Sequence, residues 1–172
     1  MSKKEDILNA ALTCFAEQGI SATTTKQIAN AAAVSEALIF KHFTSKQNLI
    51  DAIMVLAKKR AEVVINEWEK SEHPKLIIKS ILREAVGIDY HDFKLLLFLN
   101  QFKDWDFLYS WNFTLEFNEK ILKVFHQIGV TDPKQERTLF WMHLYGIVLY
   151  KKHFDIHDNI ALYEQLTSKY QV

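Results

Sequence analysis

Hydrophobic residues recur along most of the chain with the period of an α-helix. In the first segment, Ile7, Ala11 and Phe15 form one apolar stripe at i, i+4 spacing. The 172 residues include only four glycines and two prolines, so few positions interrupt this pattern. No stretch alternates apolar and polar residues for long, as a half-exposed strand would. The pattern therefore predicts an all-α protein.

Breaks in the apolar pattern and helix-start signals divide the chain into helices. Three segments have the form of a capping box, in which a hydroxyl and a Glu or Gln three residues later satisfy the first backbone amides: Ser2 with Glu5, Thr24 with Gln27 and Thr44 with Gln47. Helices are expected at about residues 3–18, 25–32, 35–42, 44–72, 75–86, 90–103, 106–128, 133–153 and 157–170.

The two short helices within residues 25–42 have the pattern of a helix-turn-helix. Ala29 is small where the second helix must cross the first closely, and the turn falls at about Ala33-Val34. Ile28, Val34 and Ile39 supply apolar side chains for a small core between the helices. In such a motif the second helix enters the major groove of DNA.

The ordered pattern from Ile7 to Ile53 resembles the DNA-binding head of TetR-family regulators. The segments that carry this resemblance are Ile7 to Ala11, Phe15 to Gly19, Thr24 to Ala29, Val34-Ser35, His42-Phe43 and Ser45 to Ile50. The resemblance implies a three-helix DNA-binding head over residues 1–50 and a helical ligand-binding and dimerisation body over residues 51–172. It also implies a homodimeric, ligand-responsive regulator, in most cases a repressor, that binds a pseudo-palindromic operator.

The resemblance further implies which residues contact DNA. They open the first helix of the motif, lie on or beside the second helix, or open the helix that follows: Thr24, Thr25, Lys26, Ser35, Glu36, Ala37, Lys41, His42 and Lys46. The sequence departs from the family pattern at Ala33, where glycine is usual, and at Leu38 and Phe40, which lack phosphate-binding hydroxyls. Contact with a thymine methyl group and packing against the protein are both open to Leu38.

The remainder of the chain is rich in aromatic residues, which favours either an ordinary core or an apolar effector site. The family places a small-molecule pocket here, and the candidates to line it are Phe98, Phe102, Trp105, Trp111, Phe117, Trp141 and Tyr145, with Asn112 as a further polar group. The segment from Leu139 to Tyr150 is apolar nearly all round, so it needs cover on two sides. The resemblance implies pairing with a second copy through residues 133–170.

Charge and composition change this picture only slightly. The net charge is zero, but residues 1–60 hold eight Lys/Arg and five Asp/Glu, a net of +3 on the segment expected to meet DNA. Cys14 is the single cysteine and is expected in the core. No apolar signal segment or membrane-spanning window is visible, which favours a cytoplasmic protein without a membrane partner.

No signature of catalysis or of a cofactor is visible, so we expect neither. His153, Asp155 and His157 span an expected helix end and are not expected to bind a metal. Two alternatives remain open at this point. The body could serve pairing or protein contacts without an effector, or the chain could be a helical-bundle enzyme or carrier with a coincidental head.

Overall fold

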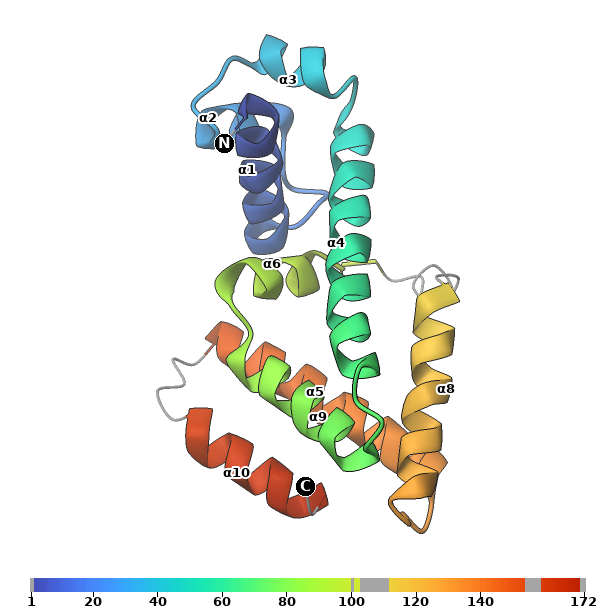
Figure 1. Ribbon diagram of the computed structural model, residues 1–172. Helices are drawn as coiled ribbons and strands as arrows, with labels where there is room; N and C mark the ends of the chain where they lie inside the picture. The colour runs from blue at the N-terminus through green and yellow to red at the C-terminus, as the bar shows by residue number, and fades with distance from the viewer. Residues whose placement is uncertain (1, 100, 103–111, 154–158, 171–172) are drawn as a thin grey trace. The chain divides into compact units, whose positions relative to one another are not determined.

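The computed structural model describes residues 2–99, 101–102, 112–153 and 159–170. Within these ranges the chain forms helices joined by short turns, and no strand is present (Figure 1). The predicted all-α fold is confirmed. The helices are α1 Lys3–Gln18, α2 Thr25–Ala31, α3 Glu36–His42, α4 Lys46–Glu69, α5 Pro74–Gly87, α6 Tyr90–Leu99, α8 Asn112–Gln127, α9 Pro133–His153 and α10 Asn159–Tyr170.

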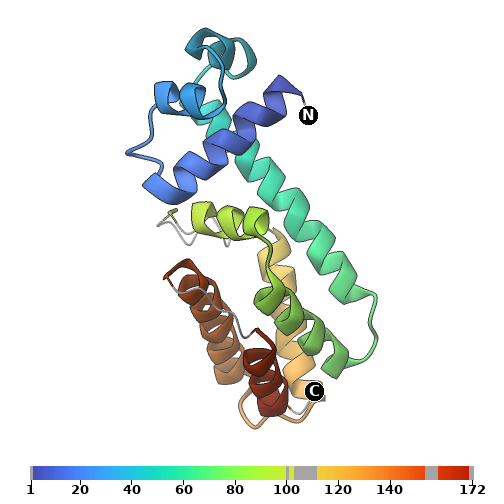
Figure 2. The ribbon, with the colours of Figure 1, turned by 90° about the vertical axis from the view of Figure 1, so that its left-hand side faces the viewer.

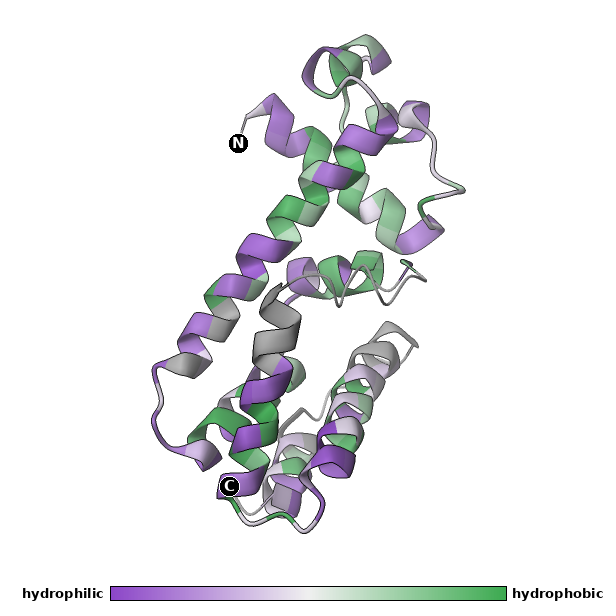
Figure 3. Ribbon diagram, turned by 90° about the vertical axis from the view of Figure 1, so that its right-hand side faces the viewer, coloured by the Kyte–Doolittle hydropathy of each residue, from purple (hydrophilic) through white to green (hydrophobic). Residues whose placement is uncertain are grey.

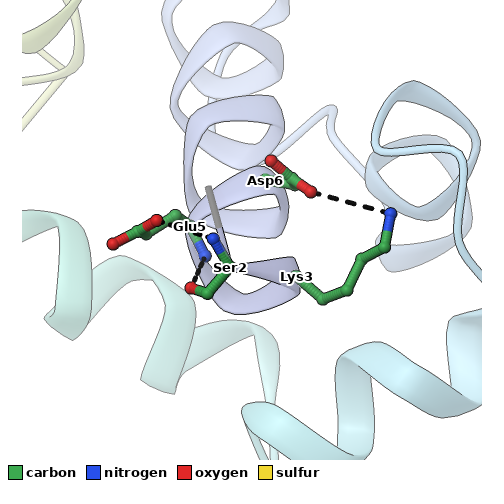
Figure 4. Close-up of polar contacts among 4 residues, drawn as sticks. All are labelled: Ser2, Lys3, Glu5 and Asp6. Carbon is green, nitrogen blue, oxygen red and sulfur yellow. Dashed lines mark hydrogen bonds and ion pairs between the residues drawn. The ribbon is translucent and has the colours of Figure 1, made fainter.

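Two of the three predicted capping boxes are present. At the start of α1, Ser2 Oγ accepts from the Glu5 amide at 3.3 Å, and the Glu5 carboxylate accepts from the Ser2 amide at 2.8 Å (Figure 4). Lys3 adds an ion pair with Asp6 at 3.7 Å in the same turn (Figure 4). Thr24 and Gln27 form the equivalent box at the start of α2. Local hydrogen bonding therefore sets where these two helices begin.

The third predicted box, Thr44 with Gln47, is wrong. Helix α4 begins at Lys46, and the Asn48 amide donates to Ser45 Oγ at 3.2 Å. The Gln47 side chain turns forward instead and donates to Asp51 Oδ1 at 2.9 Å. Ser45 stands one position after Thr44 and is an equally good capping residue, so the helix start shifts by one residue.

The chain divides into two compact units. The head unit consists of Met1–Ala61 and Tyr90–Lys103, and the body unit of Glu62–Asp89 and Asp104–Val172. In the head unit, Ile7 and Phe15 of α1 are fully buried, as are Leu49 and Ile53 of α4. Cys14 is buried among them, as predicted, and burial raises the pKa of its thiol. The thiol therefore stays protonated and packs as a small apolar group.

The head unit includes α6, which the sequence pattern assigns to the body. Helix α6 lies across the C-terminal end of α1 (Figure 2). Phe98 of α6 is fully buried, with its ring centroid 6.0 Å from that of Phe15. The head unit therefore includes a segment distant in sequence that covers the apolar end of α1, and the DNA-binding domain over residues 1–50 stays a prediction.

The Gln101 side chain fastens the end of α6 to the end of α1. Its Oε1 accepts from the Ile20 amide at 2.6 Å, and its Nε2 donates to the Phe15 carbonyl at 2.5 Å. Gly19, between these two partners, has φ +94°, a conformation that favours glycine. One amide side chain thus satisfies both a donor and an acceptor of the backbone where α1 ends.

Further polar contacts join α6 to α1 and α4. Lys94 Nζ donates to Thr13 Oγ1 at 2.8 Å, and Arg60 pairs with Asp92 at 2.6 Å. The Tyr90 hydroxyl donates to Glu17 Oε1 at 3.1 Å, and this hydrogen bond raises the pKa of Tyr90. These contacts fix the position of α6 along α1 in addition to the apolar contact.

The body unit has its own apolar core. Helix α5 buries one face against α8, α9 and α10, and the core residues are Ile77, Ile78, Ile81, Leu82, Val86, Ile121, Val124, Phe125, Phe140, Leu144, Ile147, Leu166 and Tyr170. Phe140 stands edge-on to Phe125 and to Tyr170, with centroids 5.5 Å apart in each case. Burial and the neighbouring Glu136 raise the pKa of Tyr170 well above its usual value.

Among the described residues, no helix combines the length and the hydrophobicity that a membrane span requires.

The Gln101 contacts generate a prediction about stability. We expect Gln101→Ala to lower the free energy of unfolding by about 1–3 kcal/mol, because two part-buried backbone groups lose their partner. Urea unfolding followed by circular dichroism measures this change. Gln135→Ala, which truncates an exposed glutamine on α9, is the matched control and should change the free energy by less than about 0.5 kcal/mol. Equal values for the two variants would contradict the role given to Gln101.

Candidate nucleic-acid interface

Helices α2 and α3 form a helix-turn-helix. Ile28 and Ala29 of α2 and Ile39 of α3 are buried, and the two helices contact each other. The turn between them is held by its own backbone, since the Ala33 amide donates to the Asn30 carbonyl at 3.1 Å and the Val34 amide to the Ala29 carbonyl at 3.0 Å. The predicted arrangement of a small residue, a turn and aliphatic residues is therefore present.

Ala33 occupies the left-handed conformation within this turn. Its φ is +51°, and it is the single non-glycine residue with positive φ among the residues that the structure describes. Ala33 is also the position where the sequence departs from the glycine that is usual in the family. A left-handed conformation costs an L-residue about 1–2 kcal/mol, so the turn retains its geometry despite local strain.

Side chains of the motif fix the relative position of α2 and α3. Ser35 caps α3, with its Oγ accepting from the Leu38 amide at 3.2 Å. The Thr25 hydroxyl donates to Glu36 Oε1 at 2.5 Å, which links the first turn of α2 to the first turn of α3. Thr25, Ser35 and Glu36 therefore have structural partners in addition to the DNA contacts predicted for them.

All nine predicted DNA-contacting residues lie within or beside α2, α3 and the first turn of α4. Six of them are exposed: Thr24, Lys26, Ser35, Ala37, Lys41 and His42. Thr25, Glu36 and Lys46 are half-buried, and Lys46 Nζ lies 5.9 Å from the centroid of the Phe15 ring. The motif therefore presents Lys26, Lys41 and His42 to solvent, which is the arrangement that binding to a polyanion requires.

Two residues of the head unit, Phe40 and Gln101, are more important in the structure than the sequence predicted. Phe40 is 46% exposed on α3, although contact between a phenyl ring and water is energetically unfavourable. Gln101 holds the end of α1, but a single polar residue after an apolar helix gives no signal of such a role. Only the apolar character of Phe40 is visible in the sequence, as a departure from the family pattern.

The predicted ligand-binding residues whose side chains are described belong to both units. Phe98 and Phe102 belong to the head unit, where their rings meet edge-on at 5.3 Å. Trp141 and Tyr145 belong to the body unit, and Trp141 Nε1 donates to Asn118 Oδ1 at 2.8 Å. The other candidates lie outside the described residues or have side chains outside them: Trp105, Trp111, Asn112 and Phe117.

An open hollow of about 510 Å³ is present on the body unit where α5 begins and α8 ends. Its lining residues are His73, Pro74, Lys75, Gln127 and Ile128, none of which the sequence indicates. The described residues hold no cluster of three or more metal-binding side chains. The segment with Asp155 and His157 lies outside the described residues, as does the His153 side chain.

Sequence comparisons find similarity to known bacterial regulators. The profile described as "Bacterial regulatory proteins, tetR family" matches residues 7–53. The uncharacterized HTH-type transcriptional regulator YvkB of Bacillus subtilis (strain 168) is 35% identical over 94 residues, which cover 45% of this chain and 50% of that protein. The chain thus spans about half the length of this curated relative.

Two solved structures share the fold over nearly the whole chain. The ketosteroid transcriptional regulator KstR2 of Mycobacterium tuberculosis has a TM-score of 0.75 at 16% identity, covering 98% of this chain and 93% of that one. AibR, solved in complex with isovaleryl coenzyme A and operator DNA, has a TM-score of 0.71 at 17% identity, covering 89% and 88%. At these identities the likeness shows the fold alone.

The strained turn generates a prediction with an internal control. We expect Ala33→Gly to raise the free energy of unfolding by about 1 kcal/mol, because glycine adopts positive φ without steric cost. Ala32→Gly should lower it by about 0.5–1 kcal/mol, since Ala32 has φ −82° and ψ −2° and gains nothing from glycine.

Thermal and urea unfolding of the two variants measure these opposite changes. If both substitutions were destabilising, Ala33 would not be strained in the folded protein.

Proposed function

We propose that the chain is a transcriptional repressor of the tetR family, whose profile matches residues 7–53, and that it binds operator DNA through α2 and α3. The observation that carries the proposal is the exposure of Lys26, Lys41 and His42 on a motif whose other face is buried. Such a motif places α3 in the major groove, which is wide enough to admit a helix.

Electrostatics supports DNA as the partner. Residues 1–60 carry a net charge of +3 within a chain of zero net charge. Lys26 lies in the first turn of α2, and Lys41 and His42 in the last turn of α3. Contacts of Lys side chains with phosphates fix the register of a protein on DNA, whereas contacts with base edges select the sequence.

Helix α9 has the two faces that pairing with a second copy requires. Phe140, Leu144 and Ile147 are buried in the body core. On another face, Leu139, Met142, Gly146 and Tyr150 follow the spacing i, i+3, i+7 and i+11, and the three side chains among them are 37%, 63% and 52% exposed. A Cβ placed on Gly146 would meet nothing within 4 Å, so a second helix has room to approach. We infer a homodimer that pairs through α9 and α10.

A two-fold dimer would present two copies of α3 to one side of the duplex. The operator would then be pseudo-palindromic, with half-sites about 10 base pairs apart or a multiple of that distance. The complex of the similarly folded AibR with operator DNA supports a DNA-bound state for this architecture.

We further propose a small apolar or aromatic effector that binds the body and releases the DNA. Helix α4 runs without a break from Lys46 in the head unit to Glu69 in the body unit, so it can pass a change in one unit to the other. The effector would act only through its different affinities for two conformations of the dimer. AibR was solved with isovaleryl coenzyme A, which supports an acyl thioester as one class to test.

A body without an effector is the second candidate function. It is favoured by the lining of the hollow on the body unit, His73, Pro74, Lys75, Gln127 and Ile128, which includes none of the aromatic candidates. Titration of the DNA complex with acyl thioesters and with aromatic compounds separates the two candidates. Release of DNA by any of them would exclude the second.

Selection of bound fragments from the source genome tests the proposed function itself. Salt-sensitive binding to a pseudo-palindromic site is the expected result. If no fragment is bound at low salt, the chain is not a DNA-binding regulator.

Lys41 provides a quantitative prediction. We expect Lys41→Ala to weaken binding to every duplex and to reduce the slope of log affinity against log salt by about 0.9 for each phosphate that the lysine neutralises. Fluorescence anisotropy with a labelled duplex at several salt concentrations measures the slope. Lys123→Ala, which removes an exposed lysine from α8 of the body, should leave the slope unchanged. An unchanged slope for Lys41→Ala would remove Lys41 from the interface.

The exposed face of α9 provides a second prediction. We expect Met142→Asp to raise the dimer dissociation constant by at least about thirtyfold, because an unpaired charge buried between two apolar helices costs several kcal/mol. Sedimentation velocity over a range of protein concentrations measures this change. Leu76→Asp is the matched control, since Leu76 is 49% exposed on α5 and lies outside the proposed interface. A Met142→Asp variant as dimeric as the control would show that this face does not pair.

A further inference from the structure

The exposed surface of α3 includes apolar side chains beside Lys41 and His42. Ile39 and Phe43 turn inward and are 0% and 4% exposed. On the other sides of the helix, Ala37 is exposed, Leu38 is half-buried and Phe40 is 46% exposed. Figure 3 shows hydrophobic positions on this helix beside hydrophilic ones. Ala37 and Phe40 are three residues apart and therefore neighbours on the helix surface.

Polar groups at the start of α3 already have partners. Ser35 Oγ accepts from the Leu38 amide, and the Glu36 carboxylate accepts from the Thr25 hydroxyl. The helix Glu36–His42 contains no Arg, Asn or Gln, and Lys41 is its single side chain of a type that forms paired hydrogen bonds with guanine or adenine. Ala37 lies in the first turn of α3, where recognition helices contact base edges, and Phe40 lies one turn further along the same face.

We propose that Phe40, together with Ala37, recognises thymine methyl groups in the major groove and is a specificity-determining residue of the operator contact. The inference rests on the proposed function and adds the chemistry of the bases that are read. The C5 methyl of thymine is the apolar group on the major-groove edge of the four base pairs. Contact with it removes apolar surface of both partners from water, which accounts for an exposed phenylalanine on this helix.

The motif then makes two kinds of contact with the duplex. Phe40 and Ala37 select base pairs through the methyl groups, while Lys26 and Lys41 supply the charge that holds the duplex. A half-site read in this way carries thymines at fixed positions beneath Phe40 and Ala37. Replacing thymine by deoxyuridine at those positions removes the methyl group and leaves every hydrogen-bonding group of the base pair in place.

A deoxyuridine scan of the selected operator tests the proposal with the full chain. Each thymine of one half-site is replaced in turn, and the affinity is measured by fluorescence anisotropy at constant salt. We expect affinity to fall about fourfold at each contacted methyl group and to stay unchanged at the other thymines. Phe40→Ala should bind the thymine and deoxyuridine operators equally at the positions read by Phe40.

Two further variants control for the removal of a phenyl ring or of apolar surface elsewhere. Phe40→Tyr keeps the ring and should keep the preference for thymine. Leu76→Ala, which truncates an exposed side chain on α5, should keep both the affinity and the preference. Circular dichroism melting confirms that each variant is folded.

The outcomes separate this inference from the function on which it rests. If the wild-type protein binds the operator but tolerates deoxyuridine at every position, the methyl contact is excluded and DNA binding stands. If Phe40→Ala keeps the full preference for thymine at every position, Phe40 does not read the methyl groups, and DNA binding again stands. If the protein binds no DNA fragment at all, both the function and the inference are overturned.

Discussion

The burial of Ile28 and Ala29 on α2 and of Ile39 on α3 is the packing on which the proposed interface depends. Fully burying an isoleucine side chain stabilises a fold by about 1.5–3 kcal/mol. The left-handed conformation of Ala33 costs about 1–2 kcal/mol. Packing therefore outweighs the strain, and the turn keeps its shape without the usual glycine. Without this packing, Lys41 and His42 would no longer be presented on a fixed helix.

The head unit depends in turn on a segment distant in sequence. Helix α6 covers the end of α1 through the contact of Phe98 with Phe15, and Gln101 bonds to the backbone at Phe15 and Ile20. The two Gln101 hydrogen bonds join residues separated by 81 and 86 positions. The support of the DNA-binding motif therefore includes residues beyond the segment that resembles the family.

Helix α9 shows how a single helix can serve both a core and a surface. Phe140 packs edge-on against Phe125 and Tyr170, which anchors one face of the helix in the body. On another face, Met142 and Tyr150 expose apolar surface to water, which is energetically unfavourable. A monomeric protein rarely keeps a contiguous apolar stripe exposed. For this reason we propose that a second copy of the chain covers this face of α9.

The helices, their order and the position of the helix-turn-helix could be predicted before any coordinates, because these features depend on contacts within three or four residues. The boxes at Ser2 and Thr24 are of this kind, and the error at Thr44 arose where Ser45 competed over the same short range. The three-dimensional packing was needed to establish that α6 packs against α1, that Glu36 binds Thr25 and that Phe98 meets Phe15. Those contacts depend on which distant apolar surfaces bury each other. The hydrophobic effect is not directional, so a periodic pattern shows that a helix face is buried but not which element covers it.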